Sequence, residues 1–163
     1  MSVFFEDLVI GEREDLGSHL FTAEEIKAFA SAYDPQPFHL DEAAAEASPF
    51  GGLCASGWHT AGVWMRLMVQ TRLRKAAVRQ AEGLPVARMG PSPGFKDMRW
   101  ILPVFAGDTI SFDSTLVEKR SSASRPGWGL VTHLNTGANQ KGERVFAFTS
   151  TAFWQTRDDG KAG

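Results

Sequence analysis

A change in the spacing of apolar residues near the middle of the chain constrains the fold more than any other feature. Residues 58–80 have helical spacing; the first half is apolar on nearly all sides and the second half is basic and amphipathic. That profile is typical of a helix that starts buried and ends at the surface. After a loop at residues 83–94, apolar residues recur at every second position, which predicts β-strands. Four such strands are expected, at residues 95–102, 109–118, 128–136 and 144–155.

An antiparallel sheet of this size has one apolar face that must be covered, and the long helix is the available cover. We therefore predict an α+β fold, a single domain in which a curved antiparallel sheet wraps around one helix. The residues expected to share a face in each strand are Met98, Trp100 and Leu102; Ile110, Phe112 and Leu116; Leu130, Thr132 and Leu134; and Phe146, Phe148, Ala152 and Trp154.

The first part of the chain predicts shorter elements. Residues 3–21 are expected to form one or two strands around a charged turn. Thr22 and Glu25 have the spacing of a capping box, in which each side chain bonds the backbone N–H of the other residue, at the start of a helix over residues 23–33. That helix must end at Asp34, because a residue before proline is excluded from the α region.

Composition and charge exclude several functions. The net charge is −2 with acids and bases mixed, which argues against nucleic acid as the main partner. A single cysteine, Cys54, rules out an internal disulfide and a cysteine-built zinc site. The N-terminus does not resemble a secretory signal, and no stretch approaches the roughly 18 apolar residues that span a bilayer, so we expect a cytoplasmic protein. One basic run, Arg72, Arg74, Lys75 and Arg79, has the helical spacing of a solvated face.

The stretch DPQPFH, residues 34–39, places an aspartate and a histidine around two prolines. Asp34 and Gln36 both precede proline, so the segment is expected to be extended rather than helical. A stiff loop holds its side chains at little entropic cost, as a catalytic pair requires. A rigid turn in which Asp34 and His39 are purely structural is equally compatible with this spacing.

A glycine-rich loop leads into the long helix. Asp41 can cap a second short helix at residues 42–47, and residues 51–57 then read GGLCASG. Glycine lets a ligand approach the backbone closely, and the first turn of a helix presents unused N–H groups with a partial positive charge. Such a helix start suits a carbonyl oxygen that gains negative charge during a reaction.

These two stretches resemble the signature of the MaoC-like family, the (R)-specific enoyl-CoA hydratase branch of the hotdog fold. The similar segments are residues 33–41, 50–52 and 55–57, together with LPVFAGDTI at 102–110. The resemblance implies a single MaoC-like hotdog domain over residues 1–163, with an ordered core at about 4–156 and a flexible tail at 157–163. It also implies a homodimer that acts on coenzyme A thioesters with no further cofactor and no metal.

The same resemblance implies roles for individual residues. Asp34 and His39 would activate water for addition to a trans-2-enoyl-CoA, and the backbone N–H of Gly57 would be the oxyanion donor. The chain departs from the family pattern at Tyr33, Gln36 and Ser56, where glycine, asparagine and histidine are usual, and these departures affect the acyl pocket. The expected pocket residues are Tyr33, Gln36, Phe38, Ser56 and Trp58.

Two other functions remain open from the sequence. A hotdog thioesterase would usually carry an acid on the central helix, and residues 58–70 contain none. The alternative that is not an enzyme is a non-catalytic acyl-CoA-binding subunit.

For several other residues the sequence gives only weak evidence of a role in the site. His59 is expected to be buried or at an interface; Cys54 is not expected to act as a nucleophile, because no basic neighbour is evident. Lys96 and Arg99 lie in the region of the chain where coenzyme A phosphates could bind. His19 and His133 fall in strand patterns and are expected to be structural or exposed.

Overall fold

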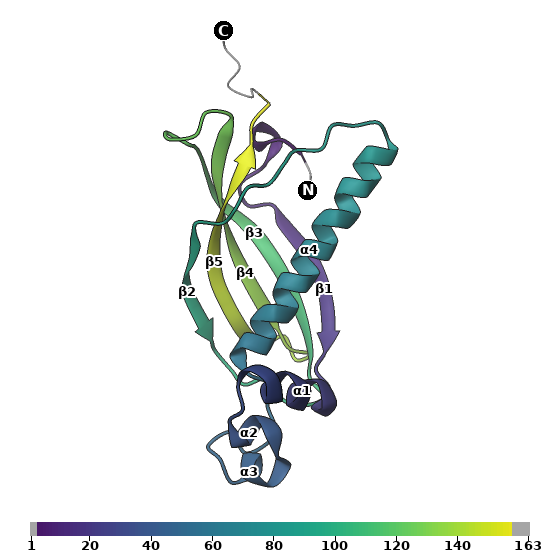
Figure 1. The fold of residues 1–163 in the computed structure, drawn as a ribbon, viewed down its shortest axis with the longest axis vertical. Coiled ribbons are helices and arrows are strands. Elements are labelled where there is room, and N and C mark those ends of the chain that lie inside the picture. Colours follow the sequence, from purple (N-terminus) through teal and green to yellow (C-terminus); the bar gives the residue numbers. More distant parts are fainter. Residues whose placement is uncertain (1–2, 158–163) are drawn as a thin grey trace.

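The computed structural model describes residues 3–157 and shows a sheet curved around one long helix (Figure 1). The five strands are antiparallel and lie in the order β1-β3-β4-β5-β2, so β1 and β2 form the edges. The strands are β1 (Arg13–Leu20), β2 (Gly94–Trp100), β3 (Thr109–Ser121), β4 (Trp128–Ala138) and β5 (Arg144–Gln155). The helices are η1 (Phe5–Asp7), α1 (Ala23–Tyr33), α2 (Pro37–Leu40), α3 (Glu42–Glu46) and α4 (Gly57–Ala81).

The predicted α+β architecture is confirmed. The buried face of α4 presents Val63, Trp64 and Met68 to the inner face of the sheet, where Phe112 and Phe146 are fully buried. Since each strand alternates its side chains, the remaining face of the sheet lies away from the helix. Within residues 3–157, no helix is long and apolar enough to cross a membrane. The predicted tail falls almost entirely on residues 158–163, which lie outside the described part of the chain.

The face of β4 that was predicted from Leu130, Thr132 and Leu134 is not the more deeply buried one. Leu130 and Leu134 do share a face, but they are only half-buried, whereas Val131 and Asn135 are completely buried. Val131 pairs across the sheet with Ala152, and Asn135 pairs with Phe148, so these residues share the inner face. A period of two identifies residues on one side of a strand without saying which side meets the core.

The N-terminal region also differs in part from expectation. Only β1 is a strand there, and the residues before it form the short 3₁₀ helix η1. Thr22 caps α1 as predicted, since its hydroxyl accepts from the Glu25 N–H at 3.2 Å. The side chain of Glu25 instead binds His19, with Oε2 3.0 Å from Nε2, so the reciprocal half of the capping box is replaced by a tertiary contact.

The basic run on α4 was predicted to be a solvated face, but only part of it is exposed. Arg74 is exposed, and Lys75 forms an ion pair with Glu14. Arg72 is instead half-buried, with its guanidinium 5.4 Å from the centre of the Trp154 ring.

Candidate active site

The acid of the DPQPFH stretch follows one helix, and the imidazole lies in the next. Asp34 is the C-cap residue after α1 and is not helical, and Gln36 has extended backbone, as expected of residues before proline. The expectation that His39 is also extended was wrong, because Pro37 begins the helical turn α2. Proline suits the first position of a helix, where its fixed φ fits and the N–H it lacks would have no helical partner. The short helix α2 therefore sets the orientation of the His39 side chain.

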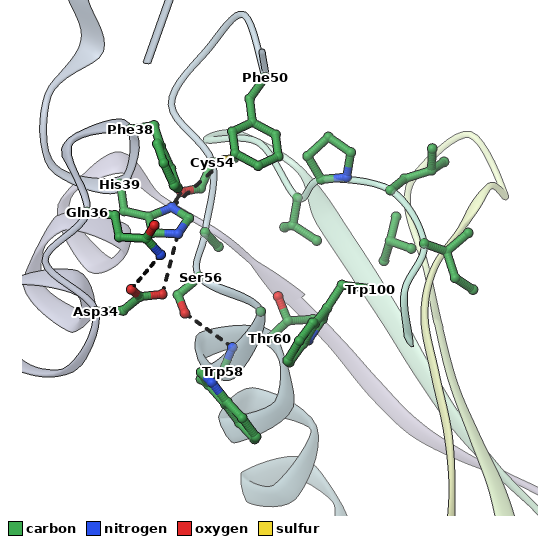
Figure 2. A pocket seen from close by; sticks show the side chains of 17 residues that line it. Asp34, Gln36, Phe38, His39, Phe50, Cys54, Ser56, Trp58, Thr60 and Trp100 are labelled. Carbon is green, nitrogen blue, oxygen red and sulfur yellow. Dashed lines mark hydrogen bonds and ion pairs between the residues drawn. The ribbon is translucent and has the colours of Figure 1, made fainter. Parts of the chain in front are cut away.

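His39 is 5% exposed, and its hydrogen-bond partners define its tautomer. Its Nδ1 lies 2.7 Å from the backbone carbonyl oxygen of Cys54. A carbonyl oxygen can only accept, so Nδ1 carries the hydrogen and donates it. In the neutral ring, Nε2 then holds a lone pair, and this atom lies 3.5 Å from Oδ2 of Asp34 (Figure 2).

The carboxylate of Asp34 is held in its ionised form. A hydrogen bond with the Ser56 side chain is the main cause that lowers the pKa of Asp34; a second hydrogen bond from Gln36 and the nearby His39 act in the same direction. The Gln36 Nε2 donates to Oδ1 at 2.9 Å. This network leaves Oδ2 directed toward His39 as an acceptor (Figure 2).

Ser56 also caps α4, next to the Asp34–His39 pair. Its Oγ accepts from the Trp58 N–H at 3.2 Å, and its carbonyl accepts from the N–H groups of His59 and Thr60. Among residues 3–157, the N–H of Gly57 has no hydrogen-bond acceptor. The first turn of α4 therefore offers one unused donor, with the partial positive charge of a helix N-terminus behind it.

These groups line one cavity of about 460 Å³, a size common for small-molecule sites. Seven of the residues expected at the site contribute to its wall: Asp34, Gln36, Phe38, His39, Ser56, Gly57 and Trp58. Tyr33 does not line it, contrary to expectation. Tyr33 is 76% exposed as a residue, and its ring packs against Phe29 with the ring centres 5.0 Å apart.

Some of the residues that line the cavity were not predicted to belong to the site. Phe50, Thr60 and the segment 100–104 line it, together with Val145. Trp100 lies on the edge strand β2 and packs edge to face against Trp58, with ring centres 5.3 Å apart. The sequence pattern grouped Trp100 with Met98 and Leu102 on one face of a strand, but did not connect it with the site.

The other residues considered in the sequence are not among the groups that could take part in a reaction. His59 is buried as predicted; it stacks on Phe29, and burial lowers its pKa to about 4. Cys54 does have an imidazole neighbour, with Sγ 3.8 Å from His39 Nδ1, but burial raises the pKa of its thiol. Lys96 and Arg99 do not line this cavity. Within the described residues, no cluster of His, Cys, Asp or Glu is arranged to hold a metal ion.

A curved five-stranded sheet around one long helix, with the site at the start of that helix, defines a protein of the hotdog fold. The chain belongs to the MaoC-like family, because the MaoC-like domain model matches residues 10–136. A crystal structure of the MaoC-like dehydratase from Rhodospirillum rubrum is 41% identical with a TM-score of 0.80, and the match covers 95% of this chain and 98% of that one.

Two further relatives have names that describe an activity. The fold is similar to that of an (R)-hydratase from A. caviae involved in PHA biosynthesis, at 23% identity and a TM-score of 0.65, over 90% of this chain and 97% of that one. Mesaconyl-CoA hydratase from Cereibacter sphaeroides is 32% identical over 65 residues, which is 40% of this chain and 19% of that enzyme. The match thus spans about a fifth of that enzyme.

Proposed function

We propose that the chain adds water to trans-2-enoyl-CoA thioesters to give (R)-3-hydroxyacyl-CoA, and catalyses the reverse dehydration. The observation that carries this proposal is the meeting of two acceptors, Asp34 Oδ2 and His39 Nε2, with the unused Gly57 N–H in one cavity. The names of the family and of the two hydratases support the class of reaction.

The two acceptors can hold one water molecule between them. Atoms 3.5 Å apart can each accept one hydrogen of the same water at ordinary hydrogen-bond distances. Both hydrogens are then engaged, so the water oxygen presents a lone pair to Cβ of the enoyl group. As the C–O bond forms, Asp34 or His39 takes one proton from the water, and the electron pair of the double bond moves toward Cα. Return of that proton to Cα completes the addition of H₂O.

The negative charge that develops on the thioester oxygen needs a donor. In this proposal the Gly57 N–H is that donor, since it has no partner among the described residues and lies at the positive end of α4. Loss of one such donor typically costs about 2.7–4 kcal/mol of transition-state stabilisation. The acyl group is carried by coenzyme A, and these steps need no other cofactor.

The test is the change in absorbance of crotonyl-CoA and of longer and branched enoyl-CoAs. Asp34→Asn and His39→Ala should each lower the rate by about 10²–10⁴-fold, the usual contribution of an acid–base group. Asp41→Asn is the matched control, because asparagine also caps a helix and Asp41 lies outside the cavity. The proposal fails if wild type is inert toward every enoyl-CoA, or if both site variants remain fully active.

The same samples separate the two alternatives. Thiol release from saturated acyl-CoAs would indicate a thioesterase, which is disfavoured because the first half of α4 carries no acid. Tight binding of CoA thioesters without turnover would indicate an acyl-CoA-binding subunit.

We further propose that the chain forms a homodimer. The edge strands β1 and β2 leave unpaired backbone groups, which favour association. In addition, α4 exposes an apolar stripe at helical spacing, consisting of Trp58, Met65, Val69 and Leu73. A second copy covering this stripe would remove it from water.

A further inference from the structure

The hydroxyl of Thr60 is a buried polar group on the cavity wall that the mechanism above does not use. Thr60 lies near the start of α4, is only 2% exposed and lines the cavity (Figure 2). Its backbone N–H donates to the Ser56 carbonyl oxygen at 3.2 Å, but its hydroxyl has no hydrogen-bond partner among residues 3–157. Buried polar groups are nearly always hydrogen-bonded, so this hydroxyl requires an explanation.

The oxygen of this hydroxyl can be reached from the cavity. Within the described part of the chain, the unpaired side-chain atoms that are fully enclosed belong to His59, Trp64 and Arg72, and the Thr60 oxygen is not one of them. It therefore keeps some accessible surface. Because Thr60 is buried and lines the cavity, that surface faces the cavity. The hydroxyl is thus available to a bound molecule.

Thr60 and the unused N–H of Gly57 lie on the same face of α4. They are three residues apart, and residues at that spacing are neighbours on a helix. The Cα–Cβ bonds of a helix tilt toward its N-terminus, so the Thr60 side chain leans toward the turn that begins at Gly57. Both residues line the same cavity. One oxygen atom at this helix start can therefore accept hydrogen bonds from both.

The thioester oxygen of the substrate is the atom that would use two donors. A carbonyl oxygen has two lone pairs, and an oxygen that gains charge in a reaction is typically held by more than one donor. No lysine or arginine among the described residues lines the cavity, so neutral donors must stabilise this charge. The ring N–H of His39 is already bonded to the Cys54 carbonyl oxygen.

We propose that Thr60 donates its hydroxyl hydrogen to the thioester oxygen, as a second oxyanion donor beside the Gly57 N–H. This inference rests on the hydration proposed above and adds a catalytic residue to it. As water adds at Cβ, negative charge moves onto the thioester oxygen, and the hydrogen bond from Thr60 becomes stronger. The O–H bond of Thr60 stays intact throughout. The contact therefore stabilises the transition state more than the bound substrate.

The first test is Thr60→Val, which removes the hydroxyl and keeps the shape of the side chain. It should lower kcat for crotonyl-CoA by about 10²-fold, the usual effect of losing one oxyanion donor, and should change KM little. Thr60→Ser keeps a hydroxyl and should stay close to wild type. A fall in kcat that serine does not reverse would overturn the proposal, because it would show that Thr60 acts only by packing.

Thr71→Val is the matched control. Thr71 is equally buried on the same helix, but its hydroxyl donates to the Leu16 carbonyl oxygen and accepts from Arg74. Thr71→Val should keep the kcat of wild type and lower the melting temperature, because it leaves these partners unpaired. Thr60→Val should show the opposite pattern, with a low kcat and an unchanged or higher melting temperature, since no bond within the protein is lost.

A second measurement detects the contact without turnover. Butyryl-CoA carrying ¹³C at its thioester carbonyl is saturated and cannot be hydrated, and each hydrogen bond to a carbonyl oxygen lowers its infrared stretching frequency. The band of the bound thioester should therefore lie at higher frequency in Thr60→Val than in wild type, and Thr60→Ser should restore it. If Thr60→Val fails to fold, Thr60→Ala removes the same hydroxyl with the best helix-forming residue.

The outcomes separate this contact from the proposed activity. An active wild type, with Thr60→Val at the same kcat and with an unshifted band, would refute the contact and leave the hydration proposal standing. A wild type that is inert toward every enoyl-CoA, with a band that shifts in Thr60→Val, would refute hydration and support the contact with a bound thioester. A wild type that neither hydrates enoyl-CoAs nor binds butyryl-CoA would refute both.

Discussion

The indole of Trp100 lies directly against Gly57, the first residue of α4. The approach is so close that a Cβ at position 57 would overlap the five-membered ring of the indole, including its nitrogen. Glycine is thus required here by the neighbouring ring. The edge strand β2 thereby supplies the wall over the helix start that carries the proposed oxyanion donor.

Gly57→Ala should lower kcat/KM for enoyl-thioester hydration by about 10²-fold or more, because the new methyl group must displace Trp100 or the helix start. Gly62→Ala is the matched control: its Cβ would meet nothing within 4 Å, and it should raise helix stability by about 0.5–1 kcal/mol. A second change, Trp100→Ala, should restore part of the activity of Gly57→Ala. Steady-state kinetics of wild type and these three variants check this, and normal activity of Gly57→Ala would contradict it.

Ser56→Ala should move the acidic limb of the pH–rate profile to higher pH. Ser56 is the main cause that holds the pKa of Asp34 below its ordinary value, so its loss lets that pKa rise and the reactive carboxylate is protonated sooner as pH falls. Rates at neutral pH should change less than rates near pH 5. The measurement is kcat/KM across the acidic range.

The control for Ser56→Ala is Thr22→Ala, which removes a comparable N-cap from α1. Both variants should lose about 0.5–2 kcal/mol of stability, but only Ser56→Ala should shift the limb. An acidic limb that stays in place in Ser56→Ala would show that Ser56 does not tune Asp34.

Stability should fall as pH drops from 7 to 5, because two histidines are buried in the neutral form. Burial lowers the pKa of His59 and His133 to about 4, whereas the ordinary value is 6.5, so in this window the unfolded state binds more protons than the folded state. Each histidine should account for about 2 kcal/mol of the loss. Urea unfolding at pH 5, 6 and 7 measures it. His133→Leu should remove about half of the pH dependence, and an unchanged slope would be inconsistent with a buried neutral imidazole.

Val69→Glu should convert the proposed dimer into monomers, because it places a charge in the middle of the apolar stripe on α4. Gln70→Glu adds the same charge at the next, exposed position of the same helix and should leave the dimer intact. Light scattering after size exclusion gives the mass of each variant. A monomeric wild type, or a Val69→Glu variant with the mass of a dimer, would remove the stripe from the interface.

Much of the fold could be predicted because it follows from local patterns. The apolar run that becomes α4 and the alternation in the later strands each identify an element, and Thr22 and Asp41 mark helix starts by their side-chain chemistry. The turn at Pro37 was missed because a proline that breaks a helix from within can also begin one. The chain segments around Asp34, His39 and Gly57 were recognised by resemblance, and the structure brings them to one cavity.

What could not be predicted depends on contacts between distant residues. Trp100 joins the cavity only because β2 lies at the edge of the sheet beside the start of α4. The helical spacing of Arg72 suggests a surface residue, whereas in the structure its guanidinium lies over the ring of Trp154, which is distant in the sequence. Tyr33 is exposed and packs on Phe29 instead of lining the cavity, which its place next to Asp34 in the sequence does not reveal.

The glycine-rich loop is held to the segment before β3 by two backbone hydrogen bonds, from Ala55 N–H to the Val104 carbonyl at 2.7 Å and from Ala106 N–H to the Leu53 carbonyl at 3.0 Å. This clamp joins parts of the chain about fifty residues apart, and the two walls of the cavity lie on either side of it. Contacts between such distant segments are entropically slow to close during folding. We therefore expect the cavity to form only once the later strands have joined α4, and a fragment ending after α4 would contain Asp34, His39 and Gly57 without the residues at 100–104 that complete the pocket.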